Sequence, residues 1–150
     1  MIGALRDLPW EAPHNFLGLD GTVATFEGAR AVLLPVPYEA TTSYSGGTRR
    51  GPRAIIEASR YVELYDQELG GDPALVYGVH TLPQLELTRA GAEEAMEELR
   101  RAYVAVAKAA GGRFLLMLGG EHSVTGPAVL AQADRHPERL TVLQMDAHGD

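Results

Sequence analysis

The stretch Arg113-Phe114-Leu115-Leu116-Met117-Leu118-Gly119-Gly120-Glu121-His122-Ser123 decides the fold of this 150-residue chain. Its first six residues form a near-continuous apolar run, which is typical of a parallel strand that is covered on both faces. Gly119-Gly120 then turns the chain, and a helix is predicted over about residues 123–133, with Ser123 as its N-cap. Glu121 and His122 therefore follow the carboxyl end of a strand, where α/β sheets bind their ligands.

Apolar runs at residues 31–34, 74–79 and 140–145 predict three further buried strands. One helix is expected to open at Gly51-Pro52, because proline suits the first helical position. A second helix should follow Thr88, which can cap it, and end at Gly111-Gly112. The apolar faces predicted by helical spacing consist of Ala54, Ile55, Ala58 and Val62 in the first helix, and of Ala95, Leu99, Ala102, Val106 and Ala109 in the second.

Strands and helices therefore alternate along the chain, and this alternation predicts an α/β fold with a mostly parallel sheet. Residues 1–150 are expected to form a single domain, in which residues 1–30 are an N-terminal arm and loop. Residues 38–50 are rich in Thr, Ser and Gly and are predicted to form a long loop. The sequence shows no internal repeat and no low-complexity tract.

Composition excludes several classes of protein. The chain has no cysteine, which excludes disulfides and thiolate metal sites, so a metal here must use oxygen and imidazole ligands. The net charge of −7 argues against nucleic-acid binding. The longest clean apolar run, residues 114–118, is far shorter than the roughly 20 residues that span a membrane. Residues 1–8 lack the pattern of a secretory signal, and a cytoplasmic location is expected.

The cluster Asp146-Ala147-His148-Gly149-Asp150 follows the last apolar run. In extended backbone alternate side chains leave the same face, so two carboxylates and one imidazole can point into one pocket and hold a metal ion. The alternative is a polar loop after a strand, and the spacing alone does not decide between them. Glu121-His122 follows the preceding predicted strand at the same edge of the sheet, and this second segment favours the metal site.

These two segments resemble the motifs of the ureohydrolase family, that of arginase and agmatinase. The stretch from Thr42 to Ile55, which contains Gly46-Gly47-Thr48-Arg49-Arg50-Gly51-Pro52, resembles the agmatinase-like branch. The resemblance runs from about Val32 to Asp150 and corresponds to the N-terminal half of a family member. It implies an arginase-like three-layer α/β/α fold, which is incomplete in 150 residues.

The resemblance also implies a site for two Mn²⁺ ions. By position, His122 would bind one ion, Asp146 both ions, His148 the second ion and Asp150 the first. Asp150 would also act in catalysis by accepting a hydrogen bond from the nucleophilic hydroxide. The family completes its site with two later aspartates and with a later His and Glu, which would lie beyond Asp150. The 150 residues alone are therefore expected to bind metal weakly and to be inactive.

The implied reaction is hydrolysis of a guanidino group to urea and an amine, with agmatine giving putrescine as the first candidate. Arginase and other guanidino-acid hydrolases remain alternatives, and so does a catalytically silent binding or scaffold protein on the same fold. The expected partners are a small cationic guanidino substrate and further copies of the chain, because family members are commonly trimers or hexamers. No nucleic acid or membrane partner is expected.

Two details of the motifs bear on specificity. The family often has an aromatic residue at the position of Arg50, and this departure leaves recognition of the substrate tail open. The loop from Thr41 to Arg50 either lines the substrate entrance, through Ser43 or Tyr44, or is purely structural. Glu121 stands where the common motif has Asp, and we expect it to orient a ligand or the turn rather than to bind metal directly.

Overall fold

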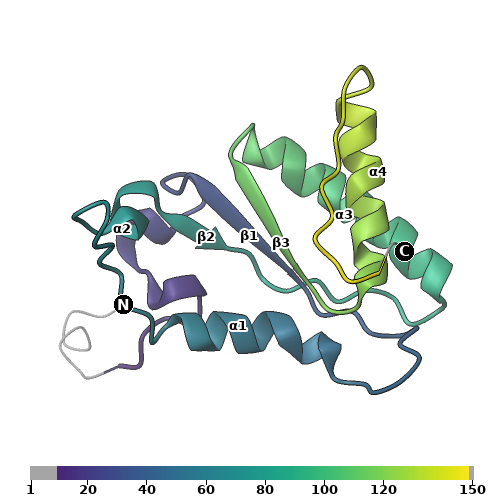
Figure 1. Ribbon diagram of the computed structural model, residues 1–150, viewed down its shortest axis with the longest axis horizontal. Coiled ribbons are helices and arrows are strands. Elements are labelled where there is room, and N and C mark those ends of the chain that lie inside the picture. Colours follow the sequence, from purple (N-terminus) through teal and green to yellow (C-terminus); the bar gives the residue numbers. More distant parts are fainter. Residues whose placement is uncertain (1–9, 149–150) are drawn as a thin grey trace.

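The computed structural model describes residues 10–148, and a three-stranded parallel sheet in the order β2-β1-β3 lies at its centre (Figure 1). The strands are β1 (Ala31–Val36), β2 (Val79–Thr81) and β3 (Phe114–Gly119). In β1, Ala31 pairs with both Val79 and Phe114, and the pairing with β3 continues to Val36 and Gly119. The carboxyl ends of β1 and β3 are therefore level with each other.

Helices cover both faces of this sheet. α1 (Gly51–Ser59) packs against one face, and α3 (Ala92–Ala110) and α4 (Thr125–Arg135) lie on the opposite side, packed against each other (Figure 1). The shorter helical segments are η2 (Phe16–Gly18), η3 (Gly21–Ala24), η4 (Thr48–Arg50), α2 (Pro73–Tyr77) and η5 (His122–Val124). These layers confirm the predicted α/β/α arrangement with a parallel sheet. No helix in residues 10–148 combines the length and the apolar composition that a membrane crossing needs.

β1 is the most deeply buried element. Leu34 and Val36 belong to the core that α3 and α4 share, together with Leu99, Tyr103, Ala107, Val124 and Ala131. Leu33 is equally buried and, because alternate residues point to opposite faces, it lies on the face that α1 covers. The strand predicted at residues 31–34 is confirmed, and burial on both faces explains its continuous apolar sequence.

The strand predicted at residues 74–79 is wrong for most of its length, because α2 occupies Pro73–Tyr77 and the strand begins only at Val79. Pro73 favours the first turn of a helix, and a short apolar run is compatible with either structure. Gly78 separates the two elements. Its φ of 67° belongs to the left-handed region, and a Cβ there would approach the carbonyl oxygen of Val23 to 2.4 Å.

The strand predicted at residues 140–145 is also wrong. These residues form no strand and are exposed, with Leu143 82% and Met145 92% exposed. An apolar pattern shows only that a segment is suited to burial. A parallel strand also needs a neighbouring strand to hydrogen-bond with and a layer of helices to cover it. β3 likewise departs from the prediction, since Phe114 and Leu116 are exposed and one face of its first half is open.

The two helices with a predicted apolar face both form, but their buried faces differ from the prediction. In α1 the buried residues are Pro52, Ile56 and Ser59, whereas Ala54, Ile55, Ala58 and Val62 are all exposed. In α3 Ala95 and Leu99 are buried as predicted, and Tyr103, Ala107 and Ala110 then replace Ala102, Val106 and Ala109. A shift of one residue rotates a helical position by about 100°, so packing against the neighbouring elements selected a different stripe.

The predicted helix caps are wrong as well. α3 begins after Gly91 rather than at Thr88, whose hydroxyl accepts a hydrogen bond from the Ala90 N–H. α4 begins after Val124, because Ser123 lies inside η5 and its hydroxyl bonds to Glu121. The predicted end of α3 is confirmed, since Gly111 adopts left-handed φ and ψ and donates its N–H to the Lys108 carbonyl.

Candidate functional site

The chain segments that leave β1 and β3 meet at the carboxyl edge of the sheet. The Gly120 N–H donates to the Val36 carbonyl at 2.9 Å, and the Glu121 N–H donates to the Tyr38 carbonyl at 2.9 Å. A Cβ on Gly120 would lie 2.0 Å from the Tyr38 oxygen, so only glycine allows this close approach. The Gly-Gly turn thus places residues 121–123 directly beside the loop that follows β1.

The carboxylate of Glu121 lies at the centre of this junction. Its Oε2 accepts the backbone N–H groups of Ala40 at 2.7 Å and Thr41 at 2.8 Å. Its Oε1 accepts the hydroxyls of Thr41 at 2.6 Å and Ser123 at 2.7 Å. Burial by itself would raise the pKa of Glu121, but these four hydrogen bonds outweigh burial and lower the pKa to about 2. The group is therefore a buried carboxylate at neutral pH, only 6% exposed.

A second carboxylate, that of Glu39, fastens the far end of the same loop. Its Oε2 accepts the N–H groups of Gly47 and Arg49 and the hydroxyl of Thr48. The hydrogen bond from the Gly47 N–H is the main cause of the lowered pKa of Glu39, and the Thr48 hydroxyl adds to it. The loop of residues 38–50 is thus held at both ends, while Tyr44 at its tip is fully exposed.

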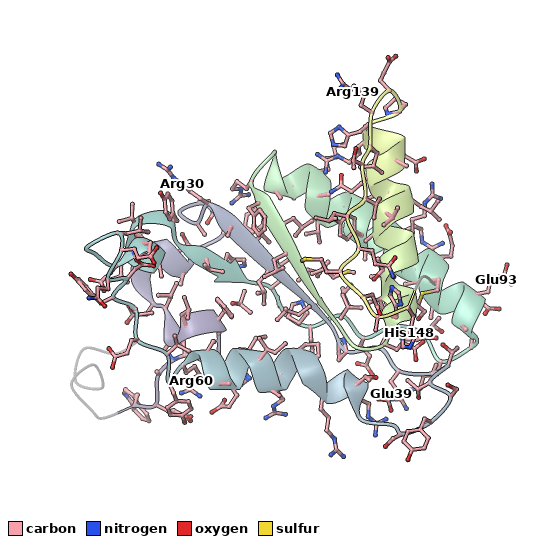
Figure 2. All side chains as sticks on the ribbon, viewed as in Figure 1. Arg30, Glu39, Arg60, Glu93, Arg139 and His148 are labelled. Carbon is pink, nitrogen blue, oxygen red and sulfur yellow. The ribbon has the colours of Figure 1, made fainter. Side chains whose placement is uncertain are left out.

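The structure brings two of the four predicted metal ligands together. The His148 N–H donates to Asp146 Oδ1 at 3.0 Å, and the imidazole Nδ1 lies 3.6 Å from the same oxygen. Both residues are exposed, and His148 lies toward the end of the sheet at which β3 finishes (Figure 2). His122 is exposed at the start of η5, and Asp150 lies outside the described residues.

The chemistry of these donors fits Mn²⁺, because carboxylate oxygen and imidazole nitrogen without sulfur suit this ion. Their geometry is open: within residues 10–148 no group of three or more His, Asp or Glu side chains gathers closely enough to hold a metal ion. The Asp146–His148 pair by itself offers too few donors to hold an ion, and the metal site stays a prediction.

Two of the other histidines, His80 and His14, make contacts within the fold. His80 Nδ1 lies 2.8 Å from the Ala24 carbonyl, and its ring packs edge-on against Phe26. His14 Nδ1 lies 3.1 Å from Glu57, which belongs to α1. These contacts hold the N-terminal segment against β2 and α1.

Glu39 and Thr41 belong to the site although the sequence did not single them out. Their only signal was position: both follow a buried strand within a few residues, in a loop whose other charged residues, Arg49 and Arg50, lie at its far end. A groove of about 1210 Å³ lies next to them, between the loop after β1, the start of α1 and residues 84–92. Of the predicted metal ligands that the structure describes, His122, Asp146 and His148 do not line this groove.

The order of these segments along the chain matches one known family. Residues 29–150 match the family model described as "Arginase family". This chain belongs to the arginase family. The match begins just before β1 and includes both the Gly-Gly-Glu-His-Ser turn and the terminal cluster.

Individual relatives in the arginase family agree with this assignment. The chain is 38% identical over 142 residues to the N(1)-aminopropylagmatine ureohydrolase of Synechocystis sp., an alignment that covers 92% of this chain and 45% of that protein. It is 41% identical over 127 residues to the protein of the same name from Thermus thermophilus, covering 85% and 42%. The chain thus spans less than half the length of the curated relatives that it matches.

Solved structures of the arginase family share the fold. A hypothetical agmatinase from Burkholderia thailandensis superposes with a TM-score of 0.78 at 24% identity, covering 93% of this chain and 44% of that one. The agmatine ureohydrolase of Thermoplasma volcanium superposes with a TM-score of 0.63 at 32% identity, covering 73% and 36%. The three-stranded sheet and its helices therefore correspond to part of the fold of these longer chains.

Proposed function

We propose that the full-length protein is a binuclear manganese hydrolase that cleaves the guanidino group of a guanidinoalkylamine to urea and an amine. The observation that carries this proposal is the extent of the arginase-family match, which includes all four predicted ligands, His122, Asp146, His148 and Asp150. A Trypanosoma cruzi formiminoglutamase variant, which shares the fold at 24% identity, was solved with Mn²⁺. The donor types of this chain suit the same ion.

The chemistry divides between the metal and the protein. Two bound Mn²⁺ ions would supply Lewis acidity and lower the pKa of a shared water, so that hydroxide is available near neutral pH. His122, Asp146, His148 and Asp150 would hold the ions, and Asp150 would also orient the attacking water. Glu121 holds the turn that carries His122. In the net reaction, the oxygen of one water adds to the guanidinium carbon, the C–N bond to the alkylamine breaks, and both protons of that water end on the departing nitrogen, which gives urea and an alkylammonium ion.

Agmatine, which would give putrescine, is one candidate substrate. N(1)-aminopropylagmatine, which would give the corresponding triamine, is the other, and one observation favours it. The relatives that share 38–41% identity are named for that substrate, whereas the agmatinases of Bacillus anthracis and Bacillus cereus share 34%. We therefore expect a higher kcat/KM with the aminopropyl compound. Arginine and other guanidino acids are expected to be poorer substrates, because they carry a carboxylate tail.

A urea-release assay tests this proposal. The full-length protein with Mn²⁺ should release urea from N(1)-aminopropylagmatine or agmatine, and less from arginine or guanidinobutyrate. His148→Asn should lower the rate about 10- to 100-fold or more, whereas His136→Asn, also at an exposed histidine, should not. Absence of urea from all four compounds would overturn the proposal and leave the silent scaffold as the better account. Light scattering of the same sample would test the proposed trimer or hexamer.

A further inference from the structure

One buried carboxylate joins two segments that lie about 80 residues apart in the sequence. Glu121 Oε1 accepts one hydroxyl from each side, Thr41 from the loop after β1 and Ser123 from the turn after β3. Oε2 accepts two backbone N–H groups, from Ala40 and Thr41. An ionised carboxylate only accepts hydrogen bonds, so it suits four convergent donors better than an amide or a hydroxyl would.

The backbone of Glu121 is fixed along with its side chain. Its N–H donates to the Tyr38 carbonyl at 2.9 Å, and its own carbonyl accepts the Val124 N–H at 3.4 Å. The next residue in the chain is His122, a predicted metal ligand that opens η5. Any displacement of the Glu121 carboxylate therefore moves the loop after β1 and the turn that carries His122 together.

The loop has a second attachment that does not involve this turn. Glu39 accepts the Gly47 and Arg49 N–H groups and the Thr48 hydroxyl, and these contacts close the loop near η4. The chain thus offers two carboxylates on one loop. Only Glu121 also touches the segment that holds a predicted ligand, so Glu39 is a matched control.

We infer that Glu121 is a positioning residue that couples the loop of residues 38–50 to the metal-binding turn at His122. The inference rests on the proposed function, because it treats the loop as one wall of the guanidino-substrate site and His122 as a ligand. Coupling of this kind is reciprocal: metal bound at the turn orders the loop, and a fastened loop favours metal binding at the turn. The length and charge of Glu121 determine how the two segments sit together.

Two substitutions, each of which removes one hydroxyl donor to Glu121, test the contact with the loop and the contact with the His122 turn one at a time. Thr41→Val deletes the bond from the loop and keeps the β-branched shape, so it should mainly raise KM. Ser123→Ala deletes the bond on the His122 turn and should mainly weaken Mn²⁺ binding. Glu121→Gln places an amide against the donors of both segments. It should therefore raise KM and weaken Mn²⁺ binding, each by about 10- to 100-fold. Glu39→Gln loosens the loop without touching the His122 turn, so it should weaken Mn²⁺ binding less than Glu121→Gln does.

The decisive measurements on the full-length protein are Mn²⁺ titration calorimetry, kcat and KM for urea release, and hydrogen exchange of residues 38–50 with and without Mn²⁺. In the wild type Mn²⁺ should slow exchange in this loop, and in Glu121→Gln it should not. If the wild type releases urea but these variants match it in KM, Mn²⁺ affinity and loop exchange, the coupling is wrong while the function stands. If no substrate is hydrolysed, the function fails, and calorimetry and exchange still decide the coupling.

Discussion

At the residue scale, buried and half-buried carboxylates organise the candidate site more than the predicted ligands do. Glu121 and Glu39 each accept several hydrogen bonds from the loop after β1, and both have lowered pKa values. Some backbone N–H groups of the loop have no carbonyl partner. Each carboxylate accepts hydrogen bonds from such groups and takes the place of water there. The two carboxylates therefore hold the loop of residues 38–50 near both of its ends.

Glu39 should make the stability of this loop depend on pH. Its pKa is lowered from 4.5 in the folded protein, so its contribution is complete above about pH 4.5 and is lost as the pH falls below that value. Glu39→Gln should lower the melting temperature at pH 7, and this difference from wild type should shrink toward pH 3. Calorimetric melting across this range checks the prediction, with Glu86→Gln, an exposed carboxylate, as control. A difference that stays constant with pH would contradict it.

At the element scale, α1 shows what a helical pattern does and does not determine. The sequence correctly placed the start of the helix at Gly51-Pro52, because the preference of proline for the first turn is local. It misplaced the buried face, because apolar residues occupy more than one stripe and the sheet selects among them. Ile56 faces the sheet and is 5% exposed, whereas its neighbour Ile55 is 47% exposed.

These neighbouring isoleucines provide a direct test of the orientation of α1. Ile56→Ala should destabilise the protein by about 2–5 kcal/mol, since it leaves a cavity between the helix and the sheet. Ile55→Ala should cost much less, because part of that side chain already contacts water and alanine favours the helix. Equilibrium denaturation in urea at matched slopes measures both values. Equal losses, or a larger loss at Ile55, would show that the helix is rotated from this orientation.

At the scale of the whole molecule, local signals predicted the fold and long-range contacts decided the rest. Parallel strands at β1 and β3, the end of α3 at Gly111 and the strand-turn-helix around Gly120 all follow from short stretches of sequence. Residues 140–145 have the composition of a strand yet form no strand in the described chain, because a parallel strand depends on neighbours that sequence spacing cannot supply. Two partners of Glu121, Ala40 and Thr41, lie about 80 residues away and carry no periodic signal.

Metal binding should connect the parts of the molecule that the sheet leaves separate. In our proposal Mn²⁺ joins the His122 turn to the exposed segment of residues 140–148, so binding should slow hydrogen exchange there and raise the melting temperature of the full-length protein. At a free Mn²⁺ concentration 100 times Kd, the stabilisation is about 2.7 kcal/mol. Asp146→Asn keeps an oxygen that can accept the His148 N–H, so it should leave the metal-free protein intact and abolish this gain. Asp20→Asn, at an exposed carboxylate outside the site, should keep the gain. Equal Mn²⁺ stabilisation of both variants would show that Asp146 is not a metal ligand.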